Sequence, residues 1–169
     1  VVGFNSAKMA VGMGADVTIL DRDAEVLERL DNHFEGRAKT RFSNRANLAA
    51  CVAEADLVIG AVLIPGAEAP KLVSRAMLAT MKPGAVIVDL LAEGGGNCEL
   101  TRAGETVEHD GVRIIGPVNL PASVAYHASD MYARNLLNFI KPALKDGALA
   151  IDWNDEVFAS ACVTHDGVI

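Results

Sequence analysis

DLVIGAV, residues 56–62, and AVIVD, residues 85–89, are two nearly uninterrupted apolar runs in the middle of the chain. Neither run alternates apolar with polar side chains, which is typical of parallel strands buried on both faces of a sheet. Residues 16–20 and 38–42 are predicted to form two further strands. Strands separated by helical patterns imply right-handed crossovers and a parallel sheet, so the predicted fold class is α/β.

Helical patterns flank and separate these strands. Composition or apolar periodicity predicts helices over residues 4–13, 24–34 and 46–54, and from after Pro70 to about Met81. Residues 105–108 and 112–116 are predicted to form a hairpin that turns at Asp110 and Gly111.

The C-terminal part of the chain has a different pattern. NLP, residues 119–121, is predicted to be a loop, and residues 124–144 are predicted to form a long helix. One face of that helix carries four large apolar side chains, Tyr132, Leu136, Leu137 and Ile140. Such a face predicts packing against a sheet or a neighbouring domain. The residues from Leu149 onward are predicted to form short strands or turns.

The composition fits a folded domain of ordinary size. Of the 169 residues, 51% are hydrophobic, 22% charged and 5% aromatic, which excludes disorder and a disulfide scaffold. A net charge of −7 makes nucleic acid and anionic membranes poor partners. Three cysteines predict a reducing compartment, and no apolar run reaches the roughly 18–20 residues that cross a bilayer. The chain opens at Val1 inside a predicted helix entry, which predicts a fragment of a longer protein.

Two residues near the start match parts of a dinucleotide-binding pattern. Gly3 runs directly into a predicted helix, as does the last glycine of the G-x-G-x-x-G turn that faces a pyrophosphate. Asp21 follows 18 residues later at a strand end, where an acidic side chain typically accepts hydrogen bonds from ribose hydroxyls. Its carboxylate would repel a 2′-phosphate and so favour NAD over NADP, although Arg22 beside it softens that selectivity. The alternative role is the N-cap of the next helix, for which Asp21 or Asp23 would serve.

The segments after the two apolar runs are candidates for the same site. They are AVLIPG, residues 61–66, and DLLAEG, residues 89–94. Ligands of open α/β sheets bind beyond the carboxyl ends of the strands, and small or apolar residues there can lie against adenine or nicotinamide. For either loop alone, simply ending a strand is an equally good explanation.

No other pattern indicates a reactive centre. The histidines lack metal-ligand spacing, so no metal site is predicted; they are His33, His109, His127 and His165. Cys98 and Cys162 are predicted to be small buried residues rather than nucleophiles. No nucleophile elbow, phosphate-cradling GKS or GKT loop, or paired-carboxylate site is found in the sequence.

Motifs along nearly the whole chain resemble the alanine dehydrogenase / nicotinamide nucleotide transhydrogenase family. In the first half these motifs are AKMA (7–10), GADV (14–17), AVLIPG (61–66), APKL (69–72) and MKPGAVIVD (81–89). In the second half they are EGGGNC (93–98), GPVNLP (116–121), NLLNF (135–139) and CVTHDG (162–167). The second set is similar to the alpha subunit, NAD-binding domain I, of the proton-translocating NAD(P) transhydrogenase.

Two features of the resemblance point in different directions. Glu93 stands where alanine dehydrogenases usually carry Asp, which favours the transhydrogenase. Asp56 lies 35 positions after Asp21, a shorter span than in many transhydrogenase alpha chains, which carry a mobile loop there. In this respect the first half is more similar to alanine dehydrogenase.

The resemblance implies a Rossmann-type, doubly wound parallel sheet over residues 1–122, truncated before its first strand. Residues 123–169 would be a long helix and short strands of a second, discontinuous domain, returning to an N-terminal domain that precedes this chain. NAD(H) would be the cofactor. Gly3 would support the pyrophosphate turn, and Asp21, with Arg22 beside it, the ribose.

The loops would complete the nucleotide site implied by the resemblance. Ala61, Val62 and Leu63 would line the nucleotide, Glu93 and Gly95 the nicotinamide end, and Asn119, Leu120 and Pro121 the far wall. No catalytic residue is assigned, because the polar residues that clamp nicotinamide in this family come largely from the N-terminal part.

The implied reaction is hydride transfer between NAD(H) and NADP(H), coupled to proton translocation. NADP(H) would sit on a partner domain, the partners being the beta subunit with its NADP-binding and membrane domains and a second copy in a homodimer. This portion would lie at the cytoplasmic face of the bacterial inner membrane. The alternative is an alanine dehydrogenase-like, NAD-dependent oxidative deamination of L-alanine to pyruvate, and a third hypothesis is a non-catalytic nucleotide-sensing or assembly module.

Overall fold

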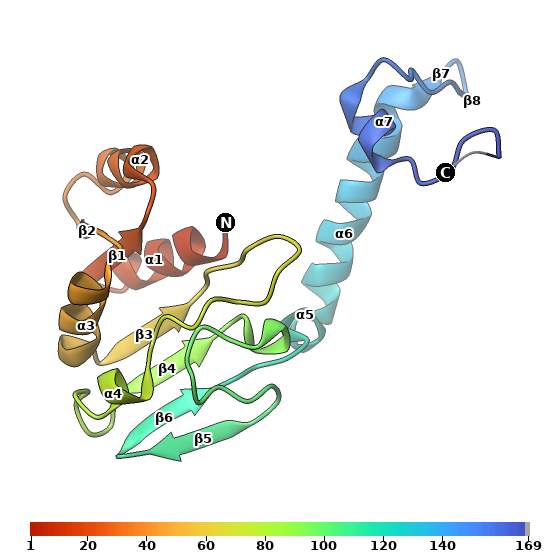
Figure 1. Cartoon of the computed structure of the whole chain (residues 1–169). Helices are drawn as coiled ribbons and strands as arrows, with labels where there is room; N and C mark the ends of the chain where they lie inside the picture. Colours follow the sequence, from red (N-terminus) through yellow and green to blue (C-terminus); the bar gives the residue numbers. More distant parts are fainter. Residues whose placement is uncertain (168–169) are drawn as a thin grey trace. The chain divides into compact units, whose positions relative to one another are not determined.

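The computed structural model describes residues 1–167, and the chain forms two compact units, Val1–Val118 and Asn119–Ile169. Figure 1 labels the helices and strands of both units. The predicted domain boundary between residues 122 and 123 falls inside a short helix at the start of the second unit.

The first unit alternates helices with strands along the chain up to its final hairpin. Its elements are α1 (Val2–Gly12), β1 (Val17–Asp21), α2 (Ala24–Phe34), β2 (Ala38–Phe42), α3 (Arg45–Glu54), β3 (Leu57–Gly60), α4 (Arg75–Leu78), β4 (Val86–Asp89), the 3-10 helix η1 (Ala92–Gly94), β5 (Thr106–His109) and β6 (Val112–Ile115). The helix α2 spans the residues that the sequence predicts, because the side chain of Asp23 caps its N-terminus and Leu30 and Phe34 bury one face.

The strands of this unit form two hydrogen-bonded sheets. β1 and β2 pair in parallel, with Val17 opposite Ala38. β3, β4 and β6 are parallel neighbours, and β5 adds an antiparallel edge (Figure 1). The predicted α/β class with parallel strands is therefore confirmed. Within residues 1–167 no strand joins β1 to β3, and α1 contacts both of them; the strand predicted to precede Val1 stays a prediction.

The strand β3 differs from its prediction. Leu57 and Ile59 are 55% and 37% exposed, so the expectation of burial on both faces is wrong. β3 is the edge strand of its sheet, and only its other face, which carries Val58, packs on a core. β4 is paired on both sides, and Ile87 at its centre is 1% exposed.

Two hydrophobic cores stabilise the first unit. The larger lies around β3, β4 and β6 and is formed by Val52, Val73, Met77, Leu78, Met81, Ala85, Ile87, Cys98, Val112 and Ile114. The smaller joins α1, α2 and β2 through Ala7, Leu30, Phe34 and Ala38.

The helix predicted between Pro70 and Met81 is shorter in the structure. α4 spans only Arg75–Leu78, and Ser74 is its N-cap, whose hydroxyl oxygen accepts a hydrogen bond from Met77 N. The preceding residues are not helical, because Leu72 N and Val73 N donate to the carbonyl of Asn97 instead.

The predicted hairpin is confirmed. β5 and β6 pair antiparallel, and both turn residues have positive φ, 49° at Asp110 and 77° at Gly111. Two positive φ angles are what a two-residue type I′ hairpin requires, and Asp-Gly supplies them at little cost.

The second unit is mainly helical. Its elements are α5 (Leu120–Ser123), α6 (Ala125–Ile140), the 3-10 helix η2 (Lys141–Ala143), β7 (Leu144–Lys145), β8 (Ala148–Leu149) and α7 (Glu156–Ala161). The loop predicted over residues 119–121 is wrong for Leu120 and Pro121, which begin α5, where a proline needs no helical N–H partner. The long helix ends at Ile140 rather than Leu144, because Pro142 lacks the N–H that would continue it.

The face of α6 that was predicted to pack is exposed. None of its 16 residues is buried, and Leu137 and Tyr132 are 59% and 66% exposed. Within residues 119–167 only Ala143 and Phe158 are buried.

No helix in the described part of the chain combines the length and the apolarity that a bilayer crossing requires.

Candidate functional site

The carboxyl ends of β3 and β4 lie side by side. Gly60 is opposite Asp89 in the parallel register, and Leu90 N donates a hydrogen bond to Gly60 O at 2.9 Å. The two loops predicted to face a nucleotide therefore begin at the same edge of the sheet. Gly3, in the first turn of α1, lies beside this edge, because a Cβ built on it would lie 3.6 Å from the Cβ of Ala61.

Asp21 ends β1, at the carboxyl end of the other parallel sheet. The structure separates its two candidate roles, because Asp23 is the N-cap of α2 and its Oδ1 accepts from Glu25 N at 2.9 Å and Val26 N at 3.3 Å. Asp21 Oδ1 accepts a hydrogen bond from Asp23 N, at 3.0 Å. Among residues 1–167 no group donates to Asp21 Oδ2, so this oxygen is available to a ribose hydroxyl. The neighbouring Arg22 is exposed.

The loop after β3 presents large apolar side chains to solvent. Val62, Leu63 and Ile64 are 42%, 63% and 46% exposed, and Ala61 is half-buried. Contiguous exposed apolar groups commonly mark ligand or partner contacts. This loop therefore offers a surface suited to the face of an aromatic ring.

Asp89 is a fully buried carboxylate that fixes the loop after β4. Its Oδ2 accepts hydrogen bonds from Cys98 N at 2.9 Å and Thr101 Oγ1 at 2.6 Å, and its Oδ1 from Leu91 N at 3.2 Å. These donors replace the water that a buried carboxylate loses. Gly96 allows the close approach, because a Cβ there would lie 2.7 Å from Asp89 Oδ2.

Asn97, 2% exposed, ties the two loops together. Its Oδ1 accepts from Val62 N at 2.9 Å, and its Nδ2 donates to Val62 O at 3.0 Å and to Pro70 O at 3.1 Å. Its backbone carbonyl accepts from the amides of Leu72 and Val73. One buried asparagine thus holds the chain after β3 at several points.

Sequence reasoning missed Asp89 and Asn97 as organisers of this edge. The available signal was a carboxylate at the end of an otherwise apolar strand, AVIVD, with a single amide following three glycines. A charged group in that setting is buried only when several donors surround it.

Glu93 and Gly95 lie on η1 and at its end, and both are exposed. Gly95 has φ 95°, a conformation that favours glycine. Lys71 Nζ donates a hydrogen bond to the Gly95 carbonyl, and Gly94 O accepts from Ala69 N at 2.9 Å. The glycine-rich segment after β4 therefore lies against the chain that follows β3.

Asn119, Leu120 and Pro121 belong to the second unit, and their part in the nucleotide site stays a prediction. Asn119 has a left-handed conformation, φ 48°, immediately before α5. Leu120 and Pro121 line a broad hollow of about 760 Å³ with residues of α5 and α6, including His127 and Tyr132.

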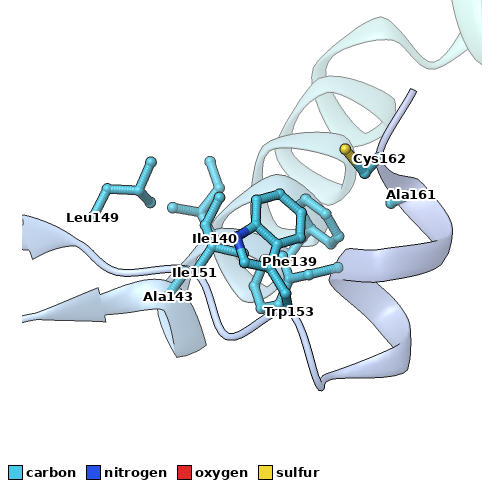
Figure 2. A pocket seen from close by; sticks show the side chains of 9 residues that line it. Phe139, Ile140, Ala143, Leu149, Ile151, Trp153, Ala161 and Cys162 are labelled. Carbon is cyan, nitrogen blue, oxygen red and sulfur yellow. The ribbon is translucent and has the colours of Figure 1, made fainter. Parts of the chain in front are cut away.

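A second hollow, of about 390 Å³, lies within the second unit (Figure 2). It is lined by Phe139, Ile140, Ala143, Leu149, Ile151, Trp153, Phe158, Ala161 and Cys162. Binding sites for small polar molecules carry several convergent polar groups, and this lining offers only an indole nitrogen and a thiol. The hollow contains none of the predicted site residues.

The described residues offer little reactive side-chain chemistry. Within residues 1–167 no group of three or more His, Cys, Asp or Glu side chains is arranged to hold a metal ion. Burial raises the pKa of the Cys98 thiol above its usual value, which keeps it protonated and a poor nucleophile. The Asp21 carboxylate, the backbone groups and the apolar side chains instead suit the binding of a cofactor that carries its own chemistry.

Comparison with known proteins gives consistent matches over the whole chain. Residues 1–169 match the family described as "Alanine dehydrogenase/PNT, C-terminal domain". The alanine dehydrogenase of Halomonas elongata is 43% identical over an alignment of 171 positions, which covers 99% of this chain and 46% of that protein. A solved transhydrogenase of Sinorhizobium meliloti is 36% identical with a TM-score of 0.86, over 99% of this chain and 49% of that one. A solved L-alanine dehydrogenase is 33% identical with a TM-score of 0.74, over 95% of this chain and 51% of that one.

Proposed function

Because the chain belongs to the alanine dehydrogenase/PNT C-terminal domain family, a family of NAD(H)-binding oxidoreductases, we propose that its first unit binds NAD(H) for hydride transfer. The chain spans about half the length of the relatives it matches. The complete reaction is therefore proposed for the longer protein. The observation that carries the proposal is Asp21 at the end of β1: among residues 1–167 no group donates a hydrogen bond to its Oδ2, while Asp23 caps α2.

The residues present fit a dinucleotide. Asp21 Oδ2 would accept a hydrogen bond from a ribose hydroxyl, and the first turn of α1, beginning beside Gly3, would face the pyrophosphate. The exposed apolar loop at residues 61–64 would cover a ring face, and Glu93 and Gly95 would lie toward the nicotinamide. Bound NAD⁺ supplies the hydride acceptor, and these residues bind and orient it.

The leading candidate reaction is the oxidative deamination of L-alanine. The curated relatives, of which the Halomonas elongata protein is 43% identical, are named alanine dehydrogenases. The short segment from Asp21 to Asp56 supports the same reaction, because many transhydrogenase alpha chains are longer there. The family prediction made from the sequence is confirmed, whereas its preference for the transhydrogenase is not.

The second candidate is transhydrogenation between NAD(H) and NADP(H). It is favoured by the TM-score of 0.86 with a solved transhydrogenase and by the EGGGNC segment at residues 93–98. In that case NADP(H) would lie on a partner domain, and the partners would include a beta subunit with a membrane domain and a second copy of this subunit. The chain would then act at the cytoplasmic face of the bacterial inner membrane.

One pair of assays on the full-length protein separates the two reactions. L-alanine and NAD⁺ should give NADH, followed by absorbance at 340 nm, if the protein is an alanine dehydrogenase. Reduction of an NADP⁺ analogue by NADH, with the NADP-binding partner added, is expected of a transhydrogenase. NADH binding with neither reaction would favour a non-catalytic nucleotide-sensing role, and failure to bind NAD(H) would contradict the proposal.

A further inference from the structure

We propose that Asn97 is a positioning residue for the NAD(H) site, because its side-chain amide holds the loop after β3 in its binding conformation. The inference rests on the proposed function. Asn97 itself would not touch the nucleotide, since its side chain is buried behind the loop. Its effect would pass through the loop that it holds, in which the side chains of Val62, Leu63 and Ile64 are exposed.

The hydrogen bonds of Asn97 are directional and use both ends of the amide. Val62 donates through its N–H to Oδ1 and accepts through its carbonyl from Nδ2, at 2.9 and 3.0 Å. The second hydrogen of Nδ2 is donated to Pro70 O at 3.1 Å. The Asn97 side chain therefore pairs with both backbone groups of Val62, as a neighbouring strand would, just past the point where β3 ends at Gly60.

This arrangement also connects the loop to the buried carboxylate. Asp89 Oδ2 accepts from the amide of Cys98, the residue next to Asn97. Gly60 lies against both side chains, because a Cβ on it would be 3.0 Å from Asp89 Oδ1 and 3.3 Å from the Cβ of Asn97. The ends of β3 and β4 and the glycine-rich segment thus form one hydrogen-bonded frame.

A preformed frame matters for binding because an ordered loop loses little conformational entropy when a ligand arrives. Without the amide, residues 61–70 would sample several conformations in the free protein. NAD(H) would then have to order the loop, and its affinity would fall although no contacting side chain had changed.

The substitution Asn97→Asp tests this directly, because it keeps the shape and removes the donor. A carboxylate would face the carbonyls of Val62 and Pro70 in a buried site, with Asp89 as a nearby like charge and Lys71 as the nearby cation. The matched control is Asn32→Asp, which adds the same charge at an exposed position on α2. Both variants are made in the full-length protein.

At pH 8, calorimetric titration of Asn97→Asp with NADH should give an affinity about 10- to 100-fold weaker than wild type, the equivalent of losing one or two buried hydrogen bonds. Asn32→Asp should stay within about twofold. Hydrogen exchange should become faster in residues 61–70 of the free Asn97→Asp protein.

A pH profile distinguishes positioning from a general structural defect. When the carboxyl group introduced by Asn97→Asp takes up a proton it becomes a donor again, so NAD⁺ binding by this variant should tighten at least about threefold between pH 8 and pH 6. The wild type and Asn32→Asp should show no such gain. Weakened binding with a flat profile would overturn the inference.

A second variant covers the case in which Asn97→Asp does not fold. Gly60→Ala presses a methyl group on the same pair of side chains and should weaken NADH binding in the same direction, by a smaller factor. Unchanged NADH affinity in a folded Asn97→Asp or Gly60→Ala protein overturns the inference alone. If the wild type fails to bind NADH, the proposed function fails, and the inference fails with it.

Discussion

The two units use their apolar residues in opposite ways. The first unit packs ten of them into one buried cluster around β3, β4 and β6, whereas α6 of the second unit has 16 residues and none is buried. The first unit therefore has a core of its own, and the second exposes the side chains that would form one. Sequence periodicity shows that a helix face is apolar, and only the structure shows whether anything covers it.

The largest expected difference concerns folding of the second unit alone. Residues 119–169 expressed separately should show no cooperative thermal unfolding by circular dichroism, because within residues 119–167 only Ala143 and Phe158 are buried. A sharp melting transition with a midpoint that does not depend on protein concentration would contradict this and would show that the second unit is stable without other contacts.

Truncation of a core residue in the first unit should have the next largest effect. Leu78 is 0% exposed. The substitution Leu78→Ala should lower the free energy of unfolding by about 2–5 kcal/mol, measured by urea denaturation of the full-length protein. The control Met13→Ala, at a position 83% exposed, should change stability by less than about 0.5 kcal/mol. Similar losses in both variants would argue against the described core.

Two neighbouring carboxylates of the first unit should separate binding from stability. Asp23→Ala removes the α2 cap and should cost about 0.5–2 kcal/mol of stability with little effect on NADH affinity. Asp21→Ala should weaken NADH binding about tenfold, as expected for one charge-assisted hydrogen bond, with a smaller loss of stability. Calorimetry measures the NADH affinity of both variants, and thermal melting measures their stability. Equal changes of affinity and of stability in the two variants would contradict the separate roles of Asp21 and Asp23.

The smallest expected effect is the pH dependence that Cys98 contributes. Burial raises the pKa of this thiol in the folded state above the ordinary value of 9.0. Below that value the thiol is protonated in both states, whereas above it the unfolded chain gains from ionisation and stability falls as pH rises. The urea concentration at the unfolding midpoint should therefore differ less between pH 8 and pH 10 in Cys98→Ala than in wild type. Cys162→Ala is the control. An equal pH slope in wild type and Cys98→Ala would contradict the assignment.

Much of the first unit could be predicted because its elements carry local signals. Asp23 and the apolar positions of α2 define that helix, and Asp110-Gly111 defines the hairpin. The exposure of Leu57 and Ile59 on β3 could not be predicted, because an apolar run does not say whether both faces of a strand are covered. The shortened α4 follows from distant hydrogen bonds to Asn97, which no local pattern contains.

The candidate site shows the same division. Spacing made Asp21 a candidate ribose ligand, and the hydrogen bonds of Asp23 were needed to show that Asp23 is the residue that caps α2. Apart from the bond of Asp89 to Leu91 N, the side-chain hydrogen bonds of Asp89 and Asn97 join residues 9 to 35 positions apart in sequence, so their importance depends on the tertiary fold. The glycine-rich segment was predicted as a cofactor contact, and the structure adds that it is held by buried polar side chains.

Titration of the full-length protein with NADH and with NADPH tests the central claim most directly. NADH should bind, and NADPH should bind at least about tenfold more weakly, because its 2′-phosphate would meet the Asp21 carboxylate. Equal affinity for the two nucleotides, or no binding of either, would contradict the assignment of Asp21 and of the first unit as an NAD(H) site.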